Sequence, residues 1–328
     1  MSRKDVSSER VVIAADPHKA SWTAAVVNSS LQPLAMLRVS VSAAGYRALR
    51  RFAGRWPQAS WAIEGAGGLG APLATRLSGD GIAVVDVPAK LAARVRLLSR
   101  GHGRKTDAAD ATSVGIAALS ATGLHTVEID EAVIALRALV EHRDDLVKTR
   151  TQTINRLHVL LTQLIPAGAP TGLSAQAAAQ LLRTVRPRTP MLRTLRALAN
   201  ELIGEIRRLD RRITATATEI TTAVAASGST LTQLYGIGNL VAGKILARVG
   251  DVGRFRSAAA FASYTGTAPI EVSSGDVVRH RLSRAGDRQL NCCLHIMAIT
   301  QISHDTPAAP TTRANAPLGR ATGKRCDA

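Results

Sequence analysis

Residues 11–40 read VVIAADPHKASWTAAVVNSSLQPLAMLRVS, and this stretch decides the fold of the first part of the chain. Three short runs rich in Val, Ala and Leu are separated by Asp-Pro and by Asn-Ser-Ser, both of which are typical of turns. Runs of this length and composition between turn residues predict a meander of three strands. We expect these strands to form one side of a sheet that the next segments extend.

The segments after the meander alternate between helical and strand patterns. The expected elements are helices near 43–53, 71–77 and 106–119, and strands at 61–64 and 82–87. Pro88 ends the second of these strands, a basic loop follows at 99–105, and Thr106 is a plausible N-cap for the last helix. Three antiparallel strands followed by alternating helices and strands make an α/β sheet, and their order resembles the ribonuclease H layout.

The middle of the chain has a different pattern, because apolar residues recur there every seven positions. They are Val133, Val140, Val147, Ile154 and Leu161. A second apolar stripe, beyond several prolines, consists of Leu195, Leu198, Leu202, Ile206, Leu209 and Ile213. These stripes predict two long helices, the first in a coiled coil, that pair with each other or across subunits.

Composition shifts divide the chain further. The predicted segments are a polar N-terminus at 1–10, an α/β domain at 11–125, a helical linker region at 126–226, a mainly helical domain at 227–305 and a disordered, low-complexity tail at 306–328.

The charge of the chain is strongly unbalanced. Its 328 residues include 42 Lys and Arg against 24 Asp and Glu, which gives a formal net charge of +18. This excess implies a polyanionic partner, and nucleic acid fits better than a membrane because no apolar run is long enough to span one. The polar opening and the three cysteines without a metal or disulfide spacing suggest a cytoplasmic, nucleoid-associated protein.

Four acidic residues are the first candidates for chemistry. Asp16 and Glu64 each end an apolar strand, and Asp107 and Asp110 lie on one face at the start of a helix. Each one alone also suits a turn or a helix start. A sheet that brings the two strand ends together, with the helix laid across them, would converge all four carboxylates. They would then need cations, and their oxygens suit Mg²⁺ or Mn²⁺, which support phosphoryl displacement. Two histidines, His18 and His102, are expected around this site or in solvent and not as ligands.

Residues 234–250, LYGIGNLVAGKILARVG, resemble a helix-hairpin-helix. Backbone amides at Gly236 and Gly238 could hold a DNA phosphate there, with Lys244 as a further contact. The alternative is a plain glycine turn between two packed helices. Upstream, Arg104 and Lys105 in the basic loop are also expected to contact nucleic acid.

A serine-rich loop precedes a basic cluster near the end of the second domain. Ser273 and Ser274 stand directly before Gly275, and the basic residues that follow include Arg279, Arg281 and Arg284. A serine hydroxyl can attack a phosphodiester when a base or metal activates it and cations surround the phosphate. A simple turn is the alternative for the serines, whereas the arginines are expected to contact phosphate.

In combination these motifs resemble the DEDD transposases of the IS110 insertion-sequence group, which also includes the Piv-type invertases. The resemblance in the first domain is carried by VVIAADPHKASWTAAVV, WAIEGAGGLGAPLA, VVDVPAK and GRKTDAADA. In the second it is carried by YGIGNLVAGKILARVGDVGRF, FASYTGTAP, SSG and HRLSRAGDRQLN. Residue by residue, it places the metal ligands at Asp16, Glu64, Asp107 and Asp110, and the catalytic serine at Ser274.

The resemblance also implies an architecture and partners. It implies a RuvC-like metal domain and a serine domain that a coiled coil joins and that meet in a composite site between subunits. It further implies a homo-oligomer, a dimer or tetramer, that forms a covalent serine–DNA intermediate and uses a structured bridge RNA to choose DNA. The family usually continues past residue 305 with basic helices, so the low-complexity tail here predicts impaired recombination.

Two other interpretations remain open from the residues. A RuvC-like, structure-specific or junction-resolving nuclease would use the same carboxylates with water as the nucleophile. A basic nucleic-acid-binding remnant would have no activity at all. Substitution of Ser274 discriminates the recombinase from the nuclease, and substitution of the carboxylates identifies the remnant.

Overall fold

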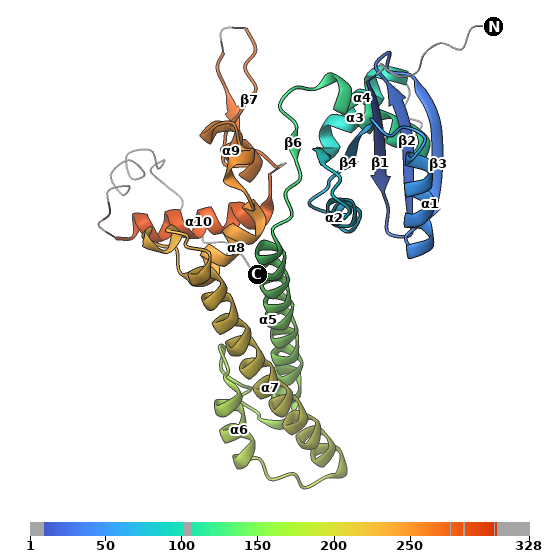
Figure 1. Ribbon diagram of the computed structural model, residues 1–328. Coiled ribbons are helices and arrows are strands. Elements are labelled where there is room, and N and C mark those ends of the chain that lie inside the picture. Colours follow the sequence, from blue (N-terminus) through green and yellow to red (C-terminus); the bar gives the residue numbers. More distant parts are fainter. Residues whose placement is uncertain (1–9, 101–105, 276, 285, 305, 307–328) are drawn as a thin grey trace, which may run out of the picture. The chain divides into compact units, whose positions relative to one another are not determined.

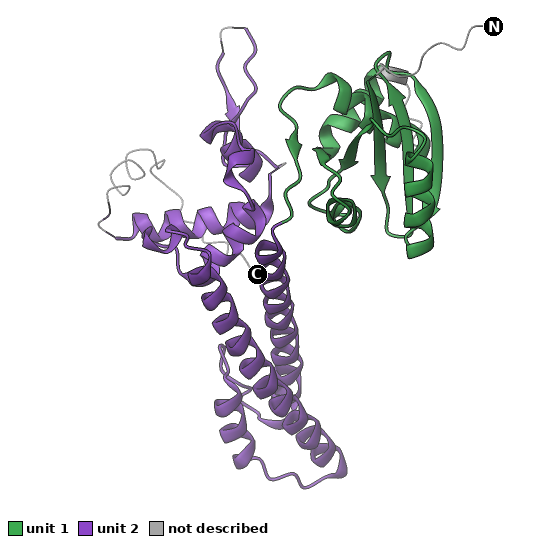
Figure 2. Cartoon of the chain, in the orientation of Figure 1, with its two compact units in different colours: residues 1–129 green, residues 130–328 purple. Residues whose placement is uncertain are grey.

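The computed structural model describes most of the chain (Figure 1). The described residues are 10–100, 106–275, 277–284, 286–304 and 306. They form two compact units, which span residues 1–129 and 130–328 (Figure 2). The predicted contact residues Arg104 and Lys105, His102 and the low-complexity tail after Thr306 lie outside the described residues. Among the described helices, none combines the length and the apolar character needed to cross a membrane.

Unit 1 is built on a six-stranded sheet in the order β3-β2-β1-β4-β5-β6. The strands are β1 (Val11–Pro17), β2 (Ser21–Asn28), β3 (Pro33–Ser40), β4 (Ser60–Glu64), β5 (Val84–Val87) and β6 (His125–Thr126). The first three form the predicted antiparallel meander, β4 and β5 run parallel to β1, and β6 runs antiparallel to β5. This order is the ribonuclease H-like layout, so the predicted fold class is confirmed.

Helices cover both faces of the sheet. They are α1 (Ala43–Ala53), α2 (Ala71–Gly79), α3 (Ala89–Arg100) and α4 (Asp107–Ser120). Because side chains alternate along a strand, Ile13 packs with residues of α1 and α2 on one face, and Val12 and Ala14 pack with residues of α3 and α4 on the other. Helix α3 follows Pro88 directly and was not expected from the sequence.

Helix α4 lies unusually close to the sheet. A Cβ atom added at Gly115 would lie 2.4 Å from Cγ2 of Val27 in β2 and 3.3 Å from Cβ of Ala14 in β1. Only glycine therefore allows this approach. The contact holds the first turn of α4 over β1 and β2 on the same sheet face as Asp16, because Asp16 lies two residues beyond Ala14 in β1.

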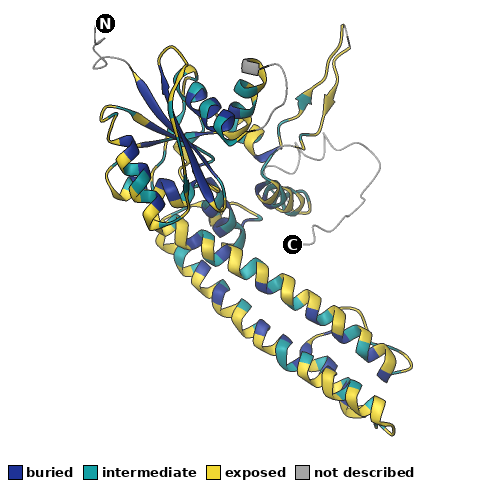
Figure 3. Cartoon of the chain, turned by 90° about the vertical axis from the view of Figure 1, so that its right-hand side faces the viewer, coloured by how far each residue is buried: buried dark blue, intermediate teal, exposed yellow. Residues whose placement is uncertain are grey.

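Unit 2 contains the two predicted long helices, α5 (Glu131–Leu164) and α7 (Pro190–Ala226), with α6 (Ala175–Thr184) between them. These long helices pack against each other within one chain, and Figure 3 shows each with a buried and an exposed side. Val140 and Leu161 of the heptad series are buried, and Ile206 and Leu209 of the second stripe are buried too. Leu198 of the second stripe is instead 44% exposed.

The rest of unit 2 consists of short elements. They are η2 (Leu231–Gln233), α8 (Asn239–Val249), η3 (Val252–Arg254), α9 (Ala258–Thr265), β7 (Ile270–Glu271), β8 (His280–Arg281) and α10 (Arg288–Ile302). A core that includes Leu136 of α5, Ile220 of α7, Ile245 of α8 and Leu290 of α10 joins the ends of the long helices to this mainly helical region. The predicted helical C-terminal part is therefore present.

Candidate active site

Two of the four predicted carboxylates come from the ends of adjacent parallel strands. Asp16 lies near the end of β1 and Glu64 is the last residue of β4. The register of these strands pairs Ala15 with Ile63, so Asp16 and Glu64 are each the next residue along. The carboxyl ends of neighbouring parallel strands are where ligand sites of open α/β sheets form. Asp16 is buried with 5% exposure, and Glu64 is half-buried.

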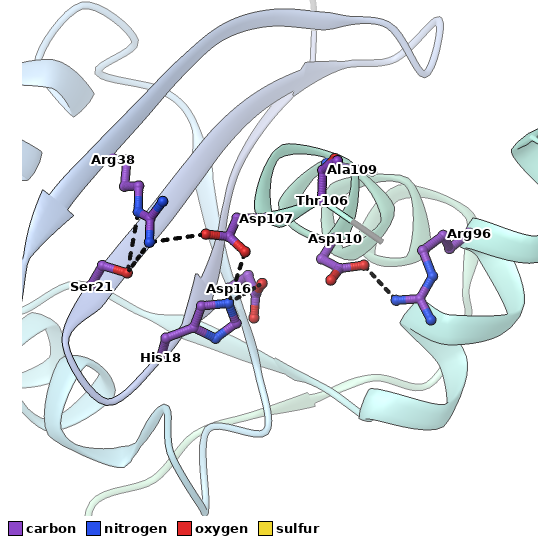
Figure 4. A network of polar contacts seen from close by, with 9 residues as sticks. All are labelled: Asp16, His18, Ser21, Arg38, Arg96, Thr106, Asp107, Ala109 and Asp110. Carbon is purple, nitrogen blue, oxygen red and sulfur yellow. Dashed lines mark hydrogen bonds and ion pairs between the residues drawn. The ribbon is translucent and has the colours of Figure 1, made fainter. Parts of the chain in front are cut away.

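The other two carboxylates come from the first turn of α4. Thr106 caps the helix, because its hydroxyl accepts a hydrogen bond from the amide of Ala109 at 3.2 Å, as the sequence predicted. Asp107 and Asp110 follow on one face of the helix. Figure 4 shows Asp107 beside His18 and Asp16, and Asp110 directed toward Arg96. Asp110 is 4% exposed, whereas Asp107 is half-buried.

Three cationic or titratable side chains accompany these carboxylates (Figure 4). His18 Nε2 lies 3.5 Å from Oδ2 of Asp16 and 3.2 Å from Oδ1 of Asp107. Arg38 of β3 lies 3.2 Å from Oδ2 of Asp107. Arg96 of α3 donates a short hydrogen bond to Oδ1 of Asp110.

The electrostatics of His18 reflect this environment. Burial alone lowers its pKa, but the hydrogen bond to Asp107 and the negative charges of Asp16 and Asp107 outweigh burial and raise the pKa above its usual value. The two carboxylates therefore favour the protonated form of the imidazole. The sequence analysis placed His18 around the site, and the structure brings it into contact with two of the predicted ligands.

The donor chemistry of the site fits a hard divalent cation. The predicted ligands are all carboxylates, two of them are buried, and buried carboxylates need positive charge nearby. Among the described residues, no three ligand-type side chains converge closely enough to hold an ion as they stand. Arg38 and Arg96 supply positive charge instead. Asp107 and Asp110 would have to turn from Arg38 and Arg96 to bind a metal.

Neither arginine was singled out by the sequence. Arg38 lies on an edge strand and Arg96 on the helix that was not predicted, and each reaches an aspartate on another element of the fold. The pairs appear only once the sheet brings β3 and α4 together and α3 packs beside α4. The nearest available signal is the basic character of the two segments, but many other segments of this strongly basic chain are basic too.

The predicted serine lies in unit 2. Ser274 is exposed, and its backbone forms a bridge with Val277 in which the two residues exchange hydrogen bonds of 3.1 and 3.2 Å. Gly275 adopts a positive φ of 56°, which a tight turn between β7 and β8 requires. The Oγ of the neighbouring Ser273 accepts a hydrogen bond from the backbone amide of Arg279 at 3.3 Å. Ser274 therefore lies at the turn of a two-stranded hairpin.

The predicted phosphate contacts of unit 2 differ in accessibility. Arg279, Arg281 and Arg284 are exposed, as a phosphate-binding surface requires. Lys244 is engaged within the fold instead, because its Nζ lies 2.8 Å from Oδ2 of Asp144 in α5. Its charge is thus already neutralised inside the protein.

The glycine turn before α8 has one packed and one open position. A Cβ added at Gly236 would lie 3.1 Å from the carbonyl oxygen of Met297, and Gly236 has a φ of 87°. This position therefore packs against α10, as expected for a turn between packed helices. Gly238 is the N-cap of α8, and a Cβ added there would meet nothing within 4 Å. Of the two predicted amides, the one at Gly238 lies in the more open surroundings.

Comparison with protein families gives two matches. Residues 13–166 match a model of the DEDD transposases of IS110 type, and residues 228–313 match the model described as the transposase IS116/IS110/IS902 family. The two matches lie on either side of the region that contains α6 and α7.

Individual relatives have similar descriptions. A Streptomyces coelicolor protein of insertion element IS110 is 28% identical, over 74% of this chain and 71% of its own length. A Streptomyces clavuligerus protein of insertion element IS116 is 25% identical, over 92% of this chain and 86% of its own. A probable family 20 transposase of Pseudomonas aeruginosa is 30% identical over 58% of each chain.

A search of solved structures gives the RuvC structure of Thermus thermophilus, at 15% identity and a TM-score of 0.27, over 36% of this chain and 99% of that one.

Proposed function

The chain belongs to the IS116/IS110/IS902 family of transposases, whose substrate is DNA, and we propose that it cuts and rejoins DNA with divalent metal held by Asp16, Glu64, Asp107 and Asp110. The observation that carries this proposal is that Asp16 of β1 and Asp107 of α4 both contact His18, while Asp110 lies buried on the same face of α4 as Asp107. Mg²⁺ or Mn²⁺ at such a site supplies Lewis-acid stabilisation of the attacking and leaving oxygens of a phosphodiester.

The protein side chains around the carboxylates have their own part in this proposal. A DNA phosphate that enters the site brings negative charge close to the carboxylates, which are themselves negatively charged. Arg38 and Arg96 lie beside these groups, and a guanidinium can bind two phosphate oxygens at once. Both arginines can therefore turn from the aspartates toward the phosphate and offset the repulsion between carboxylates and DNA.

We further propose that the Ser274 hydroxyl is the nucleophile that joins protein to DNA. Its exposure at a hairpin turn supports this role, because a nucleophile that must reach a DNA backbone cannot be buried. The exposed arginines in and after β8 offer phosphate contacts close by along the chain. A homo-oligomer with a composite site, and a structured guide RNA as second polyanion, complete the proposal, and the net charge of +18 is consistent with two nucleic-acid partners.

The alternative is a nuclease that uses water at the same carboxylates. Excision from a donor plasmid that carries the gene with its flanking DNA, together with detection of a covalent protein–DNA adduct, separates the two. We expect Asp107→Asn to abolish both signals, and Ser274→Ala to lower both by at least about 10³-fold, as loss of a nucleophile does. A water-using nuclease would keep cutting DNA with alanine at this position.

Ser273→Ala is the matched control, because it removes a hydroxyl from the adjacent position. We expect this variant to retain excision. Excision by Ser274→Ala at the wild-type rate would refute the role of Ser274 as nucleophile. Excision by Asp107→Asn at the wild-type rate would refute the metal site.

A further inference from the structure

A row of polar side chains runs across the sheet from the carboxylates to its edge. Asp16 of β1 is registered with Thr23 of β2, and Thr23 is registered with Arg38 of β3. Registered residues on neighbouring strands point to the same face, which here is the face covered by α4. The row therefore leads from the buried Asp16 to the exposed Arg38, past the first turn of α4.

A hollow of about 480 Å³ lies along this row. It is lined by Thr23, Met36, Leu37, Arg38, Asp107 and Ala108. The volume is in the range of pockets that hold small organic ligands, about 300–1,000 Å³. Because Asp107 is one of the proposed metal ligands, anything in the hollow lies directly beside the site of cutting.

Thr23 is the first sign that the hollow is built to bind something. Its side chain is 4% exposed, and its hydroxyl has no hydrogen-bond partner among the described residues. A buried hydroxyl without a partner is destabilising, and valine has the same shape without this cost. The hydroxyl oxygen is itself shielded from solvent, so a ligand oxygen in the hollow would give it the partner it lacks after a small movement of the Thr23 side chain.

Arg38 and Met36 supply a cation and an apolar surface at the rim. The side chain of Arg38 is 64% exposed, and Ser21 Oγ accepts hydrogen bonds from it at 3.2 and 3.3 Å. Met36 is 44% exposed on the same face of β3, since it lies two residues before Arg38. The hollow thus combines a positive charge, an unpaired hydroxyl and a polarisable apolar side chain.

We propose that this hollow binds one nucleotide of the DNA strand, next to the phosphodiester that is cut. The proposal rests on the proposed function and names a substrate contact for it. Arg38 binds the phosphate of this nucleotide, the Thr23 hydroxyl donates to one of its oxygens, and Met36 packs against its sugar and base. Among the lining residues, only Arg38 and Asp107 carry a charge, and no amide side chain reads a base edge, so binding is independent of sequence.

Disulfide capture tests the proposal in the full-length protein. The probe is a twelve-nucleotide oligothymidylate that carries one nucleotide with a disulfide-activated tether, in buffer with Ca²⁺. Met36→Cys places a thiol at the hollow. Leu34→Cys is the matched control, because Leu34 lies on the same strand and is 45% exposed, but does not line the hollow. Wild-type protein measures the capture by native cysteines.

We expect the cysteine at position 36 to capture the probe about tenfold faster than the one at position 34, because binding raises the local concentration of the tether. Adding Arg38→Gln should slow capture at position 36 about fivefold and weaken its salt dependence. Equal rates at positions 34 and 36, or faster capture of an oligouridylate than of the oligothymidylate, would overturn the proposal.

Thr23→Val separates a binding role from a structural one. If the hydroxyl serves the ligand, valine should slow capture at position 36 about threefold while the urea midpoint of unit 1 stays the same or rises. A lower midpoint with unchanged capture would assign Thr23 to folding. Capture needs no cutting, so this result and the Asp107→Asn test of the proposed function can fail independently.

Discussion

Substitution of Gly115 by alanine should destabilise unit 1, although alanine usually stabilises a helix. The new Cβ would lie 2.4 Å from Cγ2 of Val27 and 2.9 Å from its Cβ. Carbon atoms pack best at about 3.5–4.0 Å, so the overlap is more than about 1 Å. Val27 is fully buried in β2 and its branched side chain has few alternative rotamers. Helix α4 must therefore move away from the sheet.

The expected free-energy change follows from two opposing effects. Replacement of a mid-helix glycine by alanine stabilises by about 1 kcal/mol, and overpacking a close contact costs about 1–3 kcal/mol. With the overlap at the severe end, the net loss is about 2 kcal/mol in the free energy of unfolding. The same displacement of α4 moves Asp107 and Asp110 relative to Asp16, so DNA cutting should fall more than the fraction of folded protein does.

Urea unfolding followed by tryptophan fluorescence measures this change. The three tryptophans of the chain lie at positions 22, 56 and 61, all within unit 1. Gly79→Ala is the control, since a Cβ added at Gly79, at the end of α2, would meet nothing within 4 Å. This control should be neutral or slightly stabilising.

A double-mutant cycle with Val27→Ala completes the test. Removal of the Val27 methyl groups should relieve the 2.4 Å overlap and leave only the 2.9 Å contact with Cβ, so we expect a favourable coupling of at least about 1 kcal/mol between the two substitutions. A stabilising effect of Gly115→Ala alone, or a coupling energy of zero, would refute the argument that glycine is required for the approach of α4.

Three further predictions concern ionisable groups. Arg96→Gln leaves the buried carboxylate of Asp110 without its arginine, and it should lower the free energy of unfolding of unit 1 by about 3 kcal/mol in EDTA. Adding Asp110→Asn should recover the lost stability. Arg96→Gln with wild-type stability, or no recovery in the double variant, would contradict this prediction. Burial raises the pKa of Cys293 to about 11. At pH 8 its alkylation should therefore be at least about a hundredfold slower than that of a small-molecule thiol. A comparable alkylation rate would show that the thiol is accessible. Burial and the hydrogen bond to Asp80 raise the pKa of Tyr46 to about 12. The contribution of this pKa shift to stability should therefore be complete below pH 10 and disappear as the pH approaches 12. Tyr46→Phe should abolish this pH dependence.

The strands of unit 1 could be predicted because their sequence signals are local. The run from Val11 to Ala15 is continuously apolar, and in the structure every residue of it is buried, as expected for a strand covered on both faces. The N-cap role of Thr106 was equally predictable, since it depends on a residue type directly before a helix. Local chemistry decided both features.

The features that the sequence did not reveal depend on contacts between distant segments. Helix α3 mixes apolar and basic residues, Leu98 in it is 88% exposed, and its pattern is correspondingly weak. The pairing of Arg96 with Asp110 depends on the packing of α3 against α4, and the engagement of Lys244 by Asp144 depends on the packing of α8 against α5. Such pairs require the assembled fold.

The same long-range pairs explain how an acidic site can exist in the folded protein before metal binds. Buried carboxylates without counter-ions would take up protons or destabilise the fold. Arg38 and Arg96 provide the positive charge, and His18 contacts Asp16 and Asp107. A metal ion at the proposed ligands Asp107 and Asp110 would compete with two guanidinium groups, so the ion pairs that it broke would reduce its net binding energy. Both arginines would then be available to bind a DNA phosphate beside the carboxylates. Metal and DNA should thus bind cooperatively, because each compensates for the contacts that the other displaces.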